Sequence, residues 1–169
     1  RGQWERMPDV PGPNEGVVRR HRMPADGTIH DRLEQRMVKG RPFEEMDGEQ
    51  GDGQVLMWAR IPDVLEAVDA TALAVLGDFV PMGVGQALGV RGGGNSLDNT
   101  LRVVHGEPYD GWVLLDVEAQ GYRRSVGHGH VRLWRPDGVL LGIGSQSCIV
   151  RGQGFLPPAA DDAAVSRAV

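Results

Sequence analysis

The segment from Pro62 to Phe79 constrains the fold of this chain more than any other. Its apolar residues recur three and four positions apart, the spacing of one face of an α-helix. Pro62 suits a first helical turn, and Gly77 indicates where the helix ends. Such a helix must bury its apolar face against another layer. The residues of that face are Ile61, Val64, Leu65, Val68, Ala72, Val75, Leu76 and Phe79.

The segments on both sides of this helix have the patterns of strands. Residues 54–61 form a short apolar run, and residues 29–40 fit a strand or a helix equally well. After the helix, residues 95–105 alternate, with Leu97, Leu101 and Val103 on one face, and residues 110–122 are a second candidate strand. The pattern of residues 129–150 predicts a hairpin around a Pro-Asp-Gly turn. This order is not a βαβ alternation and predicts an α+β fold, an antiparallel sheet around one helix.

The two ends of the chain have the composition of connecting segments. Residues 1–28 combine prolines, glycines and charged residues, which predicts a linker or tail. Residues 153–169 are polar and rich in alanine, which predicts a C-terminal tail. We therefore expect one folded domain over residues 29–152, in keeping with a length of 169 residues.

Charge and cysteine content limit the partners and the compartment. The net charge is −5 with no long basic run, so nucleic acid is not an expected partner. No apolar run approaches the length of a membrane span, so no membrane partner is expected either. Cys148 is the only cysteine, which excludes an internal disulfide and favours a cytoplasmic location.

The glycine-rich segment between Gly77 and Gly94 admits two interpretations. Its "GVGQALG" differs by one position from a dinucleotide-binding fingerprint. That motif works only between a strand and the helix that follows it, whereas this one follows the predicted helix and precedes a strand. The alternative is a connection whose flanking residues carry the chemistry, and the order of the elements favours it.

Three polar residues are candidates for a site, each with a plain alternative. Asp78 ends the predicted helix, where the negative end of the dipole disfavours its charge, and is either a general base or a solvated acid. Ser96 shares a strand face with Asp98, or is a turn residue. Gln146 lies in a β-rich run, where it needs partners if buried, or it faces solvent at an edge.

The other chemistry-bearing residues give weaker signals. His128 and His130 could point the same way on a strand, but no third ligand has zinc-like spacing. Arg123 and Arg124 are either solvated or in contact with a phosphate.

Four stretches together carry a family resemblance. In order and approximate spacing, "LGDFVPM", "NSLDNTLRVVH", "GWVLLDVEAQG" and "VGHGHVRLWRPDGVLLGIGSQSCIVR" resemble the C-terminal half of acyl-CoA thioesterase II (TesB-like) enzymes, from about Ile29 to Arg151. The resemblance implies a hotdog fold and the hydrolysis of acyl-CoA to free acid and CoA, with no cofactor and no metal. It also implies a catalytic set in which Asp78 is the general base and Ser96 and Gln146 hold the attacking water.

The resemblance also raises expectations about partners. The resemblance implies two hotdog domains in one chain, whereas this sequence supplies one. Residues 1–14 would then be the end of a missing N-terminal domain and a linker. We expect a second hotdog domain or a homo-oligomer as partner. The stretch "AQGYRRSVGHG" departs from the small residues of the family and puts the substrate contacts in doubt. One alternative function is a non-catalytic acyl-CoA-binding or scaffold module. A second is a hotdog hydratase or dehydratase, but the D-x-N-P-x-x-H-like stretch that such enzymes need does not occur in this sequence.

Overall fold

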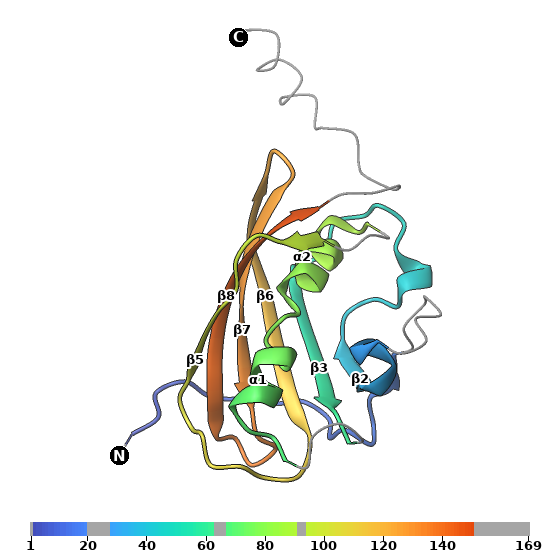
Figure 1. The fold of residues 1–169 in the computed structure, drawn as a ribbon. Coiled ribbons are helices and arrows are strands. Elements are labelled where there is room, and N and C mark those ends of the chain that lie inside the picture. Colours follow the sequence, from blue (N-terminus) through green and yellow to red (C-terminus); the bar gives the residue numbers. More distant parts are fainter. Residues whose placement is uncertain (1, 20–27, 63–66, 91–93, 151–169) are drawn as a thin grey trace, which may run out of the picture.

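A computed structural model describes residues 2–19, 28–62, 67–90 and 94–150 (Figure 1). Within these residues one antiparallel sheet curves around a helical run, which is the predicted α+β arrangement. The strands are β1 (Val17–Val18), β2 (Glu34–Lys39), β3 (Gln54–Arg60), β4 (Gly94–Ser96), β5 (Thr100–Val103), β6 (Val113–Arg123), β7 (Val126–Trp134) and β8 (Leu140–Val150). The helices are α1 (Ala70–Leu76) and α2 (Val80–Leu88), with short 3-10 turns at Ile29–Arg32 and Phe43–Glu45.

The order of the strands in the sheet is not a simple meander. The order is β1-β2-β3-β6-β7-β8-β4, and β5 also pairs with β8. Among the strands that follow the helices, only β6, β7 and β8 are consecutive neighbours, because β4 and β5 cross to the far edge while β6 pairs with β3. The β7–β8 hairpin is confirmed: the Arg135 N–H donates to the Val139 carbonyl at 2.9 Å, and Gly138 has a φ of 87°. The helical run therefore connects two distant parts of the sheet.

The helical run is shifted along the chain relative to the prediction. Regular helix begins at Ala70, after Asp69, whose carboxylate accepts from the Thr71 and Ala72 N–H groups at 2.9 and 3.0 Å. Val64 and Leu65 of the predicted apolar face lie outside the described residues. The turn at 77–79 only interrupts the run, and part of the glycine-rich segment forms α2 rather than a connection. Helix propensity gave no sign of α2, which contains Pro81 and two glycines.

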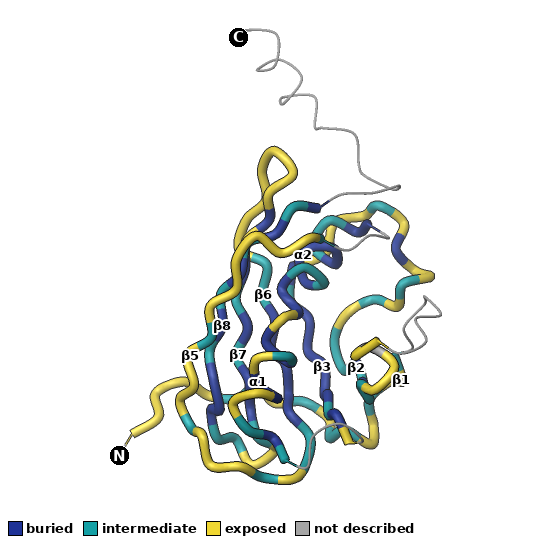
Figure 2. The backbone as a smooth tube through the Cα atoms, in the orientation of Figure 1, coloured by how far each residue is buried: buried dark blue, intermediate teal, exposed yellow. Residues whose placement is uncertain are grey.

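Close packing against the sheet explains the glycines of this region. A Cβ atom on Gly83 of α2 would lie 2.6 Å from Val117 Cγ1 on β6. On β7, a Cβ atom on Gly127 would lie 2.6 Å from Val84 Cγ1 of α2. Both distances are shorter than a carbon–carbon contact allows, so only glycine lets helix and sheet approach this closely. Figure 2 shows the buried residues along this interface.

The run Ala70–Leu88 also has the length and composition of a membrane span, with a mean hydropathy of 1.3. The expectation that no apolar segment approaches that length is therefore not met. However, 61% of the run is buried inside the protein, as expected of a core helix.

The outer face of the sheet carries a second apolar cluster: Leu56, Trp58, Leu114, Trp134 and Leu140. Met7 and Val10 of the N-terminal segment pack against it, and the Trp58 Nε1–H donates to the Pro11 carbonyl at 2.8 Å. The Gln3 side chain donates a hydrogen bond to the Gly138 carbonyl and accepts one from the Leu140 N–H. The predicted domain boundary at residue 28 stays a prediction, but residues 2–19 include a segment that lies on the sheet.

The predicted strand over residues 95–105 is two short strands. Residues 97–99 separate β4 from β5, and the proposed apolar face of this strand is not buried. Leu97 is 55% exposed and Val103 is 44% exposed. Both strands lie at an edge of the sheet, so only one side of each meets a neighbouring strand within the described residues.

Candidate active site

Three polar side chains from distant parts of the sequence meet beside α2. Gln146 on β8 donates from Nε2 to Ser96 Oγ at 2.7 Å and to Asp78 Oδ1. Ser96, the last residue of β4, donates from Oγ to the same Asp78 oxygen at 3.2 Å. The structure thus brings together all three residues that the sequence pattern singled out.

The strand register explains how Ser96 reaches Gln146. Alternation along β8 turns Gln146, Cys148 and Val150 to the buried side. Ser96 lies opposite Cys148 in the β4–β8 pair, which is one inward-facing position from Gln146. A slip of one residue in β8 would turn Gln146 away from the helix.

Asp78 is positioned by the turn between the two helices. The Gly77 N–H donates to the Leu73 carbonyl at 2.8 Å, and the Asp78 N–H donates to the Val75 carbonyl at 3.3 Å. We expected Asp78 at the negative end of one long helix, but it lies between the end of α1 and the start of α2. Since α2 begins two residues later, its positive end is close to the carboxylate and favours a negative charge there.

The three residues differ sharply in exposure. Gln146 is fully buried, whereas Asp78 and Ser96 are exposed. The Gln146 Oε1 atom is buried and has no hydrogen-bond partner among the described residues. A buried acceptor without a donor costs about 1–3 kcal/mol, so this atom can gain from a donor supplied by a bound molecule. The site therefore has a rigid buried side and an open side that carries a carboxylate.

The neighbouring candidates do not join this group. Asp98 does not contact Ser96 and instead accepts from the Ser147 N–H at 2.8 Å. The imidazoles of His128 and His130 are also engaged separately, His128 with Ser147 Oγ at 3.1 Å and His130 with Glu118 at 3.2 Å. Within the described ranges, no three His, Cys, Asp or Glu side chains are arranged to hold a metal ion.

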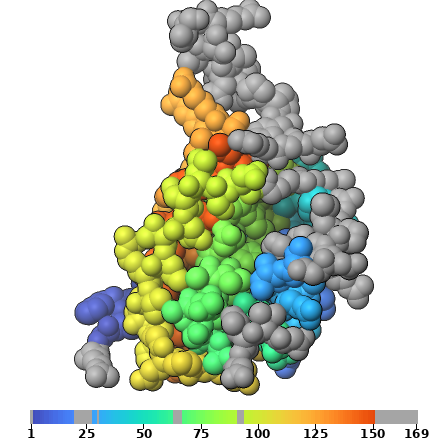
Figure 3. Space-filling view, viewed as in Figure 1, coloured from blue at the N-terminus to red at the C-terminus, as the bar shows by residue number. Residues whose placement is uncertain are grey.

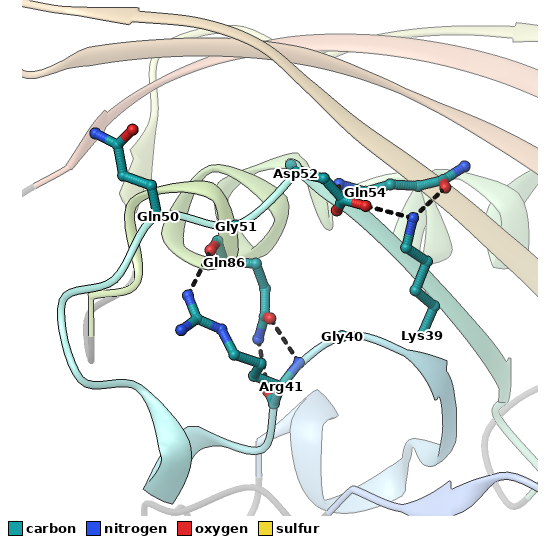
Figure 4. A pocket seen from close by; sticks show the side chains of 9 residues that line it. Lys39, Gly40, Arg41, Gln50, Gly51, Asp52, Gln54 and Gln86 are labelled. Atoms are coloured by element: carbon teal, nitrogen blue, oxygen red, sulfur yellow. Dashed lines mark hydrogen bonds and ion pairs between the residues drawn. The ribbon is translucent and has the colours of Figure 1, made fainter.

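A separate cavity of about 310 Å³ lies between the β2–β3 connection and the end of α2 (Figure 4). Gln86 closes one side of it, accepting from the Arg41 N–H at 2.8 Å and donating to the Arg41 carbonyl at 2.7 Å. Lys39 forms an ion pair with Asp52 at 2.6 Å. None of the three site residues lines this cavity. Sequence reasoning missed Gln86, whose only signal is a glutamine in an apolar helix.

The curved antiparallel sheet around a helical run is the architecture of a hotdog domain. A family model described as the acyl-CoA thioesterase C-terminal domain matches residues 5–150. The chain therefore belongs to that family. No curated protein gives a significant match.

Solved structures agree with this assignment. A candidate thioesterase from Novosphingobium aromaticivorans is similar at 30% identity and a TM-score of 0.71, over 89% of this chain and 56% of that one. Acyl-CoA thioesterase II TesB2 from Mycobacterium marinum is 20% identical with a TM-score of 0.64, over 90% of this chain and 58% of that one. A hypothetical thioesterase from Streptococcus pneumoniae, solved with coenzyme A, is 17% identical with a TM-score of 0.55, over 72% and 88%.

These likenesses confirm the predicted hotdog fold. At 17% and 20% identity the M. marinum and S. pneumoniae structures bear on the fold alone. The chain also spans less than two thirds of the length of the first two proteins.

Proposed function

We propose that this chain hydrolyses acyl-CoA thioesters to a free acid and CoA with water as the nucleophile. One observation carries the proposal: the exposed Asp78 carboxylate is held by Ser96 and by the buried amide of Gln146. Membership of the thioesterase family agrees with this chemistry. The assignment of catalytic roles to the three residues is part of the proposal.

The geometry supports a general-base mechanism. Asp78 takes a proton from water as the water oxygen bonds to the thioester carbonyl carbon. The tetrahedral intermediate then collapses, the carbon–sulfur bond breaks, and the CoA sulfur leaves and takes up the proton. Gln146 and Ser96 orient the carboxylate, and the free Gln146 Oε1 can accept a hydrogen from the water. Because a thioester is already activated, positioning and one base account for much of the rate.

A second candidate is acyl-CoA binding without hydrolysis. Gln146 Nε2 contacts Asp78 and Ser96 directly, so the three polar groups satisfy one another without a water between them. Hydrolysis requires a water at Asp78 Oδ2 or Gln146 Oε1, neither of which has a hydrogen-bond partner among the described residues. A site in which no water binds to these two oxygens would bind acyl-CoA without hydrolysing it.

Release of free thiol from acyl-CoA substrates of increasing chain length tests the proposal. The purified chain should release CoA, and Asp78→Asn should remove that activity while leaving the circular dichroism spectrum unchanged. Binding of acyl-CoA without thiol release from the unaltered chain would support the second candidate instead.

We also propose that β4 and β5 pair with a second hotdog domain, in another copy or another chain segment. Leu97, Val103 and Val104 are exposed along this edge, which lies on the face seen in Figure 3. An exposed apolar edge strand presents unpaired backbone groups to a partner. The site lies against this same edge, so a partner there would cover its open side.

A further inference from the structure

Residues 119–136, which include the turn of the β6–β7 hairpin, are basic although the chain is acidic. Residues 119–136 contain four arginines and two histidines and no aspartate or glutamate, although the net charge of the chain is −5. The hairpin projects beyond the body of the sheet (Figure 1). Its last pair joins Arg123 to Val126, so Arg124 and Ser125 form the turn.

The turn is built from residues that do not favour its backbone. Arg124 has a φ of 49° and Ser125 a φ of 66°, both in the left-handed region. Two-residue hairpin turns of this type normally use Asn-Gly or Asp-Gly, because a side chain is strained there. Strain that persists at an exposed position points to a role for the side chain itself.

Neither arginine of the tip is neutralised within the described residues. Arg41, Arg60 and Arg135 form ion pairs with aspartate or glutamate. Arg123 and Arg124 are exposed, and neither side chain makes an ion pair or hydrogen bond with a described residue. A free guanidinium group matches a phosphate group in shape and charge, and two adjacent ones can share a diphosphate.

The distance between the hairpin tip and the candidate active site matches the length of part of a CoA molecule. Ser96 is opposite Cys148, and Cys148 is opposite Gly127, two strand spacings away. Arg124 lies in the turn, three residues before Gly127, so Ser96 and Arg124 are about 14 Å apart at ordinary strand dimensions. This is comparable to the extended pantetheine arm that separates the sulfur of CoA from its diphosphate.

We propose that Arg123 and Arg124 bind the phosphate groups of CoA and hold the substrate's nucleotide end at the tip of the β6–β7 hairpin. The inference rests on the proposed function, since it takes acyl-CoA as the substrate. It also gives a role to the stretch that departs most from the small residues expected there.

Calorimetric titration of the full 169-residue chain with coenzyme A tests this assignment without relying on turnover. Arg123→Gln/Arg124→Gln should weaken CoA binding by at least tenfold at low salt, as expected when charge-assisted contacts are lost. The control Arg6→Gln/Arg32→Gln removes the same charge from two exposed positions and should stay within twofold. No CoA binding by the unaltered chain, or equal binding by the tip variant, would overturn the inference.

Arg124→Gly separates the charge of the tip from its folding. Glycine relieves the left-handed strain, so this variant should melt at the same or a higher temperature and still bind CoA more weakly. Unchanged affinity in this stable variant would count against a role for Arg124. Titration with 3′-dephospho-CoA shows which phosphate is held, because loss of the arginine effect there assigns the contact to the 3′-phosphate.

Turnover measurements distinguish the inference from the proposed function. With the tip variant, KM for acyl-CoA should rise and kcat should change little, while hydrolysis of the matching N-acetylcysteamine thioester, which has no phosphates, should be unaffected. CoA binding that depends on the arginines without any thioester hydrolysis would sink the proposed function alone. An effect on acyl-carrier-protein substrates with none on acyl-CoA would assign the tip to an acidic protein and overturn the inference.

Discussion

Gln146 Nε2 and Ser96 Oγ lie 2.7 Å apart although 50 positions separate the two residues. The same amide nitrogen donates to Asp78, which lies 68 positions before Gln146. One buried side chain therefore links the helix break to the edge strand. The role of each of these three residues can be tested by its own substitution.

Replacing Asp78 by asparagine should reduce kcat for acyl-CoA hydrolysis by about 10²–10⁴-fold, because the general base is lost. Thiol release measures the rate, and a thermal melt checks the fold. Asp98→Asn is the matched control, since Asp98 is a nearby exposed acid that contacts only the Ser147 backbone among described residues. Equal losses in both variants would show that Asp78 has no special role.

Gln146→Leu should separate activity from stability. The amide that orients Asp78 and Ser96 disappears, so kcat should fall by roughly 10²-fold, about 2.7 kcal/mol in the barrier. The melting temperature should change little, because leucine is close in size and removes a buried acceptor that has no partner. A large drop in melting temperature with full activity per folded molecule would contradict this role.

Ser96→Ala should lower kcat by about tenfold, the effect of losing one hydrogen bond in the site. Ser96→Thr keeps the hydroxyl group and suits the extended backbone of β4, so it should retain most of the activity. The pair is compared by kcat at saturating acyl-CoA. If the threonine variant is as impaired as the alanine variant, the hydroxyl group is not what matters.

Gly127→Ala should destabilise the protein by about 1–3 kcal/mol, because the new methyl group overlaps Val84 of α2. Adding Val84→Ala should recover part of the loss. Gly121→Ala, on the same hairpin with no atom within 4 Å of its new Cβ, should be neutral or slightly stabilising. Denaturant unfolding of the unaltered chain, the single variants Gly127→Ala, Val84→Ala and Gly121→Ala, and the double variant measures these differences. Additivity of Gly127→Ala and Val84→Ala would exclude the contact.

Sedimentation should show a homodimer of the isolated chain, formed through the β4–β5 edge. Leu97→Lys/Val104→Lys places charges on that exposed edge and should convert the dimer to a monomer. Val17→Lys/Val18→Lys, on the opposite edge, is the control and should remain dimeric. A monomeric unaltered chain at micromolar concentration would be evidence against this pairing.

Periodicity predicted the elements whose apolar pattern is buried on one side. The β7–β8 hairpin followed from two alternating runs and a Pro-Asp-Gly turn, which are local signals. Alternation along β8 left open whether Gln146 faces the helix or solvent, and the structure buries it. In contrast, the strand predicted over residues 95–105 is broken at residues 97–99, because an edge strand has only one neighbour and its alternation need not be buried.

The residues of the candidate site were found from sequence, but the reason that they form one site was not. The local sequence pattern placed Asp78 at a helix end. It left Ser96 as either a site residue or a turn residue, and Gln146 as either a buried site residue or a solvent-facing residue. The family resemblance joined them, and the structure places them within hydrogen-bond distance. Their roles in catalysis stay a prediction until the substitutions are measured.

By itself, the sequence determined the α+β plan, the hairpin and the identity of the polar residues, since these depend on residue type and short-range spacing. Only the tertiary structure decided that the glycine-rich segment is partly a helix. Gly83 of α2 is needed because a Cβ atom there would overlap Val117, and Gly127 of β7 is needed because a Cβ atom there would overlap Val84 of α2. That close approach involves residues tens of positions apart, which no local pattern records, and it overrides the weak helix propensity of the segment.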